Sequence, residues 1–144
     1  MQPSRVLLVE DDEDDAFLSK RSLKKAMDAR GITYDLEHVR NGKAALDRLF
    51  QGEVLRAPNF DLVLLDLMMP IMDGKETLEA IRQHPQGYKI PVVVLTTSDN
   101  HREIDLVWGH GVSAYILKPV TAADYASIMD STGTLFLRHN RSVR

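Results

Sequence analysis

Residues 60–74 of this 144-residue chain read Phe-Asp-Leu-Val-Leu-Leu-Asp-Leu-Met-Met-Pro-Ile-Met-Asp-Gly. The run Leu62–Leu65 contains no polar residue, and a short, wholly apolar run is typical of a strand that is buried on both faces. Such strands occur in parallel sheets that carry helices on both sides. This stretch therefore predicts an inner strand of an α/β protein, with the carboxylate of Asp66 directly after its last residue.

Other segments complete a pattern of alternating strands and helices. Three further apolar runs and a more polar, edge-type run predict strands at Val6–Val9, Val92–Leu95, Tyr115–Leu117 and Tyr34–Val39. Apolar residues at helical spacing mark the helices: Ala16, Leu23 and Met27; Ala45, Leu46, Leu49 and Phe50; Leu78 and Ile81; Ile104, Val107 and Trp108; and Tyr125, Ile128, Met129, Leu135 and Phe136. With right-handed crossovers, five such alternations predict a doubly wound parallel sheet with helices on both faces.

Local signals predict where some of these helices begin and end. Asp73 and Glu76 have the spacing of a capping box at a helix start. Gly31 suits the left-handed position that follows a helix. Gly133 lies inside the last helix, where glycine costs about 1 kcal/mol relative to alanine.

Composition excludes several classes of protein. Hydrophobic residues make up 44% and charged residues 27% of the chain, as in ordinary globular domains. A net charge of −3 gives no general attraction to nucleic acid or to anionic membranes, and no apolar run is long enough to span a bilayer. The chain has no cysteine, which excludes disulfides and fits a reducing compartment. We expect a single cytoplasmic domain.

Polar residues that can bind ligands or take part in catalysis follow four of the predicted strands. Glu10 and Asp11 follow the first strand, Asp66 the third, Thr96 the fourth and Lys118 the fifth. The carboxyl ends of parallel strands lie at the same edge of a sheet, so these side chains should converge there. The sequence therefore predicts one site that contains three carboxylates, a hydroxyl and an ammonium group.

Such a set of groups favours phosphoryl chemistry. Carboxylates that share a site repel one another unless a cation joins them, and oxygen ligands without His or Cys favour Mg²⁺. A lysine beside the cation adds positive charge that can stabilise a transferring phosphoryl group. Asp66 could act as the nucleophile and form an aspartyl phosphate, and Thr96 could donate a hydrogen bond to a phosphoryl oxygen.

These residues resemble the receiver domain of two-component response regulators. The resemblance rests on Val9-Glu10-Asp11, Leu65-Asp66, Met69-Pro70, Met72-Asp73-Gly74, Thr96 and Lys118-Pro119, in that order. Thr96 lies 30 residues and Lys118 lies 52 residues after Asp66, as in the family. The likeness covers about residues 4–137 and implies a flavodoxin-like sheet with strand order 2-1-3-4-5.

The resemblance also implies roles for individual residues. Asp66 would accept a phosphoryl group from the phosphohistidine of a sensor histidine kinase. Glu10 and Asp11 would hold Mg²⁺ together with Asp66 and the backbone carbonyl of Met68. Lys118 would pair with the phosphoryl charge, and its peptide bond to Pro119 would be cis.

The resemblance further implies a conformational switch. Thr96 would move toward the phosphoryl group and Tyr115 would turn inward after it. The surface of the fourth helix, fifth strand and fifth helix would carry the signal. Tyr115 could instead be an ordinary core residue.

Some features point to a narrower group, the short stand-alone regulators that serve bacterial phytochrome kinases. These features are the long connection 51–59, the stretch Leu95-Thr96-Thr97-Ser98 and the lack of an output domain in this sequence. We expect a receiver domain over residues 4–138 and a basic tail over 139–144. Some of these regulators form homodimers through the fourth-helix to fifth-helix face, which Trp108, Ile116 and Phe136 would suit.

Several other interpretations of these residues and of the function remain. Asp12–Asp15 are taken as a solvated, acidic helix start. A phosphotransfer relay or phosphate sink would use the same site. An aspartate-nucleophile phosphatase of the haloacid dehalogenase type needs an acid two residues after its nucleophile, where this chain has Met68. A flavin-binding module needs a phosphate loop, and Glu10–Asp15 would repel a phosphate there.

Overall fold

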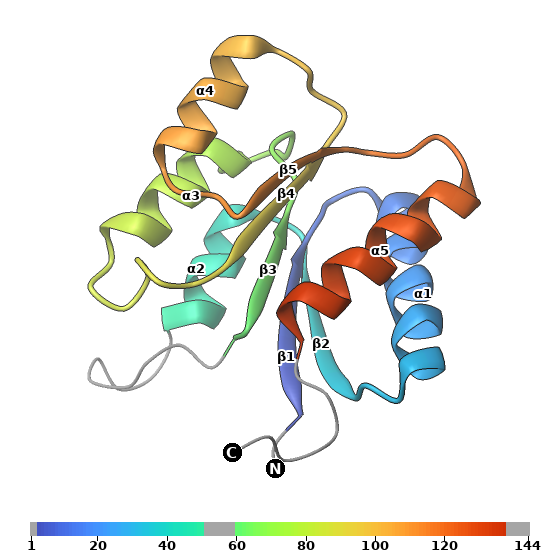
Figure 1. Cartoon of the computed structure of the whole chain (residues 1–144). Coiled ribbons are helices and arrows are strands. Elements are labelled where there is room, and N and C mark those ends of the chain that lie inside the picture. The colour runs from blue at the N-terminus through green and yellow to red at the C-terminus, as the bar shows by residue number, and fades with distance from the viewer. Residues whose placement is uncertain (1–2, 51–59, 138–144) are drawn as a thin grey trace.

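The computed structural model describes residues 3–50 and 60–137, which form a five-stranded sheet and five helices (Figure 1). In chain order the elements are β1 (Ser4–Val9), α1 (Glu13–Arg30), β2 (Tyr34–Val39), α2 (Gly42–Phe50), β3 (Leu62–Leu65), α3 (Gly74–Gln83), β4 (Val92–Thr96), α4 (His101–Gly109), β5 (Ala114–Leu117) and α5 (Ala122–Phe136). Every predicted strand and helix is confirmed, and the boundaries agree to within about two residues for the strands.

All strands are parallel, and their order is β2-β1-β3-β4-β5, as expected from the resemblance. In Figure 1, α1 and α5 lie on one face of this sheet and α2, α3 and α4 lie on the other. Val9 pairs with Leu65 across the β1–β3 boundary, so the residues that follow them leave the sheet next to each other. Those residues are Glu10 and Asp66, so the strand register itself brings the two carboxylates together.

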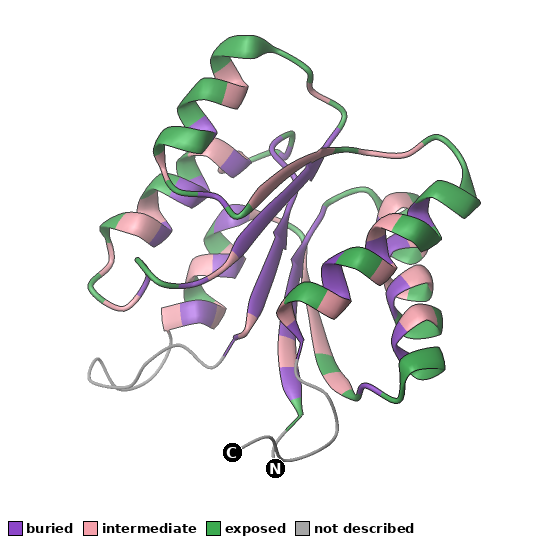
Figure 2. Cartoon of the chain, viewed as in Figure 1, coloured by how far each residue is buried: buried purple, intermediate pink, exposed green. Residues whose placement is uncertain are grey.

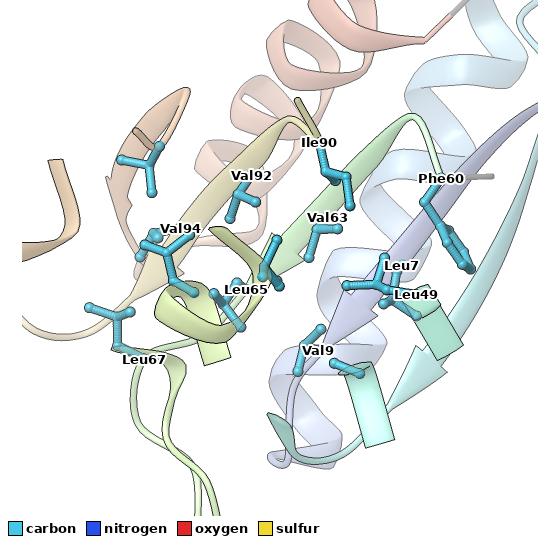
Figure 3. Close-up of a cluster of buried hydrophobic side chains, with 14 of the residues drawn as sticks. Leu7, Val9, Leu49, Phe60, Val63, Leu65, Leu67, Ile90, Val92 and Val94 are labelled. Carbon is cyan, nitrogen blue, oxygen red and sulfur yellow. The ribbon is translucent and has the colours of Figure 1, made fainter. Parts of the chain in front are cut away.

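The inner strands β1, β3 and β4 are buried almost throughout because helices cover both of their faces (Figure 2). Successive side chains of a strand point to opposite faces, so the core is divided into two layers. The layer under α2, α3 and α4 contains Leu7, Val9, Val63, Leu65, Val92 and Val94 (Figure 3). The layer under α1 and α5 contains Val6, Leu8, Leu62, Leu64, Val93 and Leu95.

Helix ends follow the local signals in the sequence. Asp73 and Glu76 form a complete capping box at the start of α3, and Gly31 ends α1 in the left-handed conformation with a φ of 70°. Close packing explains why position 133 is a glycine, because a Cβ there would lie 2.5 Å from the Met27 side chain of α1. The glycine lowers helix propensity, and in return α5 packs closely on α1.

One expectation about the backbone is wrong. No peptide bond in the described residues is cis, so Lys118 joins Pro119 through a trans bond. The trans form is the more stable one for a peptide bond before proline, by about 0.5–1 kcal/mol. With this bond trans, the backbone N–H of Lys118 donates to the carbonyl of Thr96 at 2.7 Å.

Two segments named in the sequence-based predictions lie outside the described residues, namely the connection 51–59 and the tail 139–144. Among the helices that are described, none has the length and hydropathy that crossing a bilayer requires.

Gly74 should be intolerant of a side chain because α3 starts directly against the end of β3. A Cβ at this position would lie 2.4 Å from the backbone oxygen of Asp66 and 2.5 Å from Cα of Leu67. We expect Gly74→Ala to lower the free energy of unfolding by about 1–3 kcal/mol, measured by urea denaturation. Gly109→Ala is the matched control, because a Cβ there has no atom within 4 Å. Equal stability of the two variants would contradict the close packing at Gly74.

Candidate functional site

Three carboxylates meet at the carboxyl ends of β1 and β3. Glu10 and Asp66 are 2% and 4% exposed, and Asp11 lies nearer to the solvent. Each of the three offers a carboxylate oxygen, and these oxygens all lie within 4.8 Å of one another. The sequence placed these side chains at one edge of the sheet, and the structure brings them together.

Lys118 extends from the end of β5 into this group of acids. Its Nζ lies 2.7 Å from Glu10 Oε1 and 3.1 Å from Asp66 Oδ2. A third contact, also 2.7 Å, joins Nζ to Asp15 Oδ2 in the first turn of α1. The Lys118 side chain is only 7% exposed, so its charge lies in a largely dry environment where ion pairs are strong.

Burial controls the ionisation of this site. Loss of solvent, helped by the hydrogen bond and charge of Asp66, raises the pKa of Glu10 to about 8, although Lys118 acts in the opposite direction. Burial acts to lower the pKa of Lys118, but hydrogen bonds to Asp15 and Glu10 and the charge of Asp66 outweigh it and raise that pKa. Lys118 is therefore a permanent cation, and it does not fully compensate the acids around it.

Backbone contacts fix the loop that carries Glu10 and Asp11. The N–H of Glu10 donates to the carbonyl of Val39 at 3.0 Å. His38 lies in the edge strand β2, and its Nε2 is 2.8 Å from the carbonyl oxygen of Glu10. Because a carbonyl only accepts, Nε2 carries the proton in this contact. The loop is thereby tied to β2 on its outer side.

The loop after β3 holds Asp66 in a similar way. The N–H of Asp66 donates to the carbonyl of Val9 at 3.1 Å, and the N–H of Met68 donates to Asp66 Oδ1 at 3.1 Å. Ile71, in the same loop, has a φ of 71°, which is a strained conformation for a β-branched residue. The Met68 side chain is 59% exposed beside this site.

Thr96 and Tyr115 are joined through the loop that follows β4. Thr96 is fully buried, and its Oγ1 accepts a hydrogen bond from the N–H of Ser98 at 3.4 Å. The Tyr115 hydroxyl donates to the carbonyl of Ser98 at 2.6 Å. Ser98 also donates its hydroxyl to Glu103 of α4, which pairs with Lys75 of α3 at 2.5 Å. A movement of Thr96 would thus reach Tyr115 and α4 through a single loop.

The donor set fits a divalent cation. Glu10, Asp11 and Asp66 provide only oxygen ligands, which suit hard ions such as Mg²⁺ or Mn²⁺. Burial, with the hydrogen bond and charge of Asp66, raises the pKa of Glu10, so added positive charge would stabilise its ionised form. A divalent cation would supply that charge, and carboxyl groups that bind it lose any proton they carry.

Comparison with known proteins identifies this architecture. The family model of the response regulator receiver domain matches residues 6–130. The chain belongs to the response regulator receiver family. A probable methanogenesis regulatory protein, FilR2 of Methanothrix harundinacea, is 37% identical over 142 residues, which cover 97% of this chain and 88% of that protein.

Two further response regulators are similar to this chain in sequence or structure. Response regulator Rcp1 of a Synechocystis species is 36% identical over 136 residues, covering 94% of this chain and 90% of Rcp1. The crystal structure of its Mn²⁺-bound form has a TM-score of 0.81 and covers 99% of both chains at 34% identity. The phosphorylated cyanobacterial phytochrome response regulator RcpA has a TM-score of 0.80 at 32% identity and covers 94% of both chains.

The receiver site contains one residue that sequence reasoning misassigned. Asp15 was expected to be a solvated helix-start acid, but its carboxylate is paired with Lys118. The two residues are 103 positions apart, so no local pattern connects them. Asp15 is the third residue of α1, and only the tertiary structure, which brings the start of that helix and the end of β5 to the same site, reveals the contact.

Divalent-cation binding should depend on Asp11. Asp11→Asn removes one negative charge and one carboxylate from the cluster while keeping the shape of the side chain. We expect it to weaken Mn²⁺ binding by at least about tenfold, as measured by titration calorimetry. Asp14→Asn is the matched control, because Asp14 is exposed and lies outside the cluster. Equal losses in both variants would argue against a site at the end of β1.

Proposed function

We propose that this receiver domain accepts a phosphoryl group on Asp66 from the phosphohistidine of a sensor histidine kinase. The observation that carries the proposal is the buried ammonium of Lys118, 3.1 Å from Asp66 and beside two further carboxylates. Asp66 is the acid at the centre of the sheet, since β3 lies between β1 and β4. A positive charge held next to a central carboxylate suits a phosphoryl acceptor.

The transfer is a displacement at phosphorus. A carboxylate oxygen of Asp66 attacks the phosphorus atom, the P–N bond of the phosphohistidine breaks, and the electron pair stays on the imidazole nitrogen. Lys118 neutralises charge on the phosphoryl oxygens, and the hydroxyl of Thr96 donates a hydrogen bond to one of them. A small phosphodonor can replace the kinase, because the acceptor chemistry belongs to this chain.

We propose Mg²⁺ as the resident cation, held by Glu10, Asp11, Asp66 and the backbone carbonyl of Met68. When it is bound, Mg²⁺ supplies positive charge that neutralises phosphoryl oxygens. The carboxylate cluster supports this assignment, as does the Mn²⁺-bound form of Rcp1, a protein similar to this chain.

The output follows from Thr96 and Tyr115. As Thr96 turns toward the phosphoryl group, its contact with the N–H of Ser98 is lost, and the loop to which Tyr115 and α4 are attached changes position. The surface of α4, β5 and α5 then presents a different shape to a partner. This surface carries the exposed apolar side chains Leu106, Trp108, Leu117 and Leu135.

We propose that the same surface forms a homodimer. Trp108 is 49% exposed, and Ile116 and Phe136 are partly buried, so all three remain accessible to a second copy. Similarity to Rcp1 and RcpA supports a phytochrome-type kinase as the partner. We take 4–138 as the bounds of the receiver unit. Light scattering of the unphosphorylated and phosphorylated forms tests the dimer.

A phosphatase of the haloacid dehalogenase type is not supported. Such an enzyme needs a general acid two residues after the nucleophilic aspartate, and Met68 occupies that position. The thioether has no proton to give to a leaving group. A relay or phosphate sink uses the same acceptor, and it differs only in the partner that receives the phosphoryl group.

Phosphorylation of Asp66 can be measured directly. After incubation with Mg²⁺ and acetyl phosphate, we expect the intact mass of the wild type to rise by one phosphoryl group. Asp66→Asn should show no gain, because an amide oxygen is a poor nucleophile. Asp73→Asn serves as the matched control, because Asp73 caps α3 away from the acidic cluster. Equal labelling of the wild type and Asp66→Asn would refute the proposal.

The phosphorylated state should be comparatively long-lived because Met68 is a poor residue for orienting water. Hydrolysis requires a water molecule to attack phosphorus while the P–O bond to Asp66 breaks and the water's proton passes to phosphate. Met68→Asn supplies groups that can orient this water, and we expect it to speed dephosphorylation by up to about tenfold. Met68→Leu should leave the rate unchanged. The dephosphorylation rate is measured as the loss of the phosphoryl mass with time. Slower dephosphorylation of Met68→Asn than of the wild type would show that the idea is wrong.

A further inference from the structure

Lys118 has a contact that the phosphoryl chemistry does not account for. A lysine ammonium has three protons to donate, and the three carboxylates within 3.1 Å of Nζ belong to Glu10, Asp15 and Asp66. Glu10 and Asp66 belong to the cation cluster, but Asp15 does not. Among the carboxylates of the described residues that contact Lys118, Asp15 is therefore the one outside the cation cluster.

The position of Asp15 is fixed by the start of α1. Asp12 caps the helix, and its side chain accepts a hydrogen bond from the N–H of Asp15 at 2.9 Å. The next residue, Ala16, is fully buried against the core layer that also contains Tyr125 of α5. The carboxylate of Asp15 thus projects from a capped and packed helical turn, whereas the ammonium of Lys118 ends a long and flexible side chain.

The surroundings of this ion pair are also dry on the α5 side. The buried hydroxyl of Tyr125 has no hydrogen-bond partner among the described residues. Burial, followed by the negative charge of Asp15, raises the pKa of Tyr125 to about 12. The ion pair is therefore shielded from solvent on the side of Lys118, which is 7% exposed, whereas the Asp15 side chain is 30% exposed.

We propose that Asp15 is a positioning residue for Lys118. It holds the ammonium beside Asp66 from a fixed helical turn while Glu10 and Asp66 engage the cation and the phosphoryl group. This inference rests on the proposed function, since it assumes that Lys118 neutralises a phosphoryl group on Asp66. Asp15 itself lies outside the carboxylate cluster that would hold the cation.

The test compares rates of phosphorylation by acetyl phosphate at saturating Mg²⁺, followed by intact mass. A small displacement of a group that stabilises charge has a large effect on rate, so we expect Asp15→Ala to be slower by about tenfold or more. Asp15→Asn keeps an oxygen acceptor for Lys118 and should recover most of the rate. Asp14→Ala is the matched control, because it removes the same charge from the same turn at an exposed residue.

A double-mutant comparison separates positioning from a general structural effect. In a Lys118→Ala background there is no ammonium to hold, so adding Asp15→Ala should not lower the rate further. Thermal unfolding of each variant shows whether it is folded. Calorimetric titration with Mg²⁺ alone should give Asp15→Ala an affinity close to that of the wild type, because Asp15 lies outside the cation cluster.

Two results would overturn the inference. One is a wild-type phosphorylation rate in Asp15→Ala. The other is that Asp15→Ala lowers the rate by the same factor in the Lys118→Ala background as in the wild type. If Asp15→Ala does not fold, Asp15→Asn is used instead. A phosphorylation rate of Asp15→Asn that is no higher than that of Lys118→Ala would then also overturn the inference. Asp66→Asn is run in parallel. If the wild type itself takes up no phosphoryl group, the proposed function fails, and this outcome is distinct from failure at Asp15.

Discussion

The arrangement of this domain depends on one electrostatic constraint, the compensation of buried acids by the ammonium of Lys118. Glu10 and Asp66 lose most of their hydration because they sit at the ends of two buried, adjacent strands. Two ionised carboxylates in such a place are unfavourable without positive charge. Lys118 supplies part of that charge. The negative charge that it leaves uncompensated favours a cation there, and under the proposed function Lys118 would stabilise a phosphoryl group on Asp66. The chemistry expected of this site thus follows from carboxylates that are buried without full compensation of their charge.

Helix α1 contributes more than a cover for the sheet. It packs on α5 through a close contact at Gly133, and its first turn carries the cap Asp12 and the carboxylate of Asp15. On the opposite side, the loop after β4 connects Thr96 to Tyr115 and, through Ser98 and Glu103, to Lys75 of α3. The acidic site is therefore bounded on one side by a capped helical turn and on the other by a loop whose polar contacts join it to β5, α4 and α3.

Much of the fold and part of the site could be predicted because the relevant signals are local. The apolar run Leu62–Leu65 indicates a doubly covered strand, and Glu10, Asp66, Thr96 and Lys118 each follow or end such a strand. The expected cis bond before Pro119 came from family resemblance alone, and the structure has a trans bond there. Asp15 was assigned to solvent because a run of acids at a helix start is usually hydrated. Its long-range partner could not be read from its neighbours.

The sequence by itself determined the alternation of strands and helices, the edge of the sheet that carries the candidate site, and the residue types available there. These features depend on periodicity and on the common direction of parallel strands. Only the tertiary structure decided which acids share Lys118, how deeply Glu10 and Asp66 are buried, and that Ser98 links Tyr115 to α4. Those outcomes depend on helix packing and on distances between side chains from separate elements, which a linear pattern does not contain.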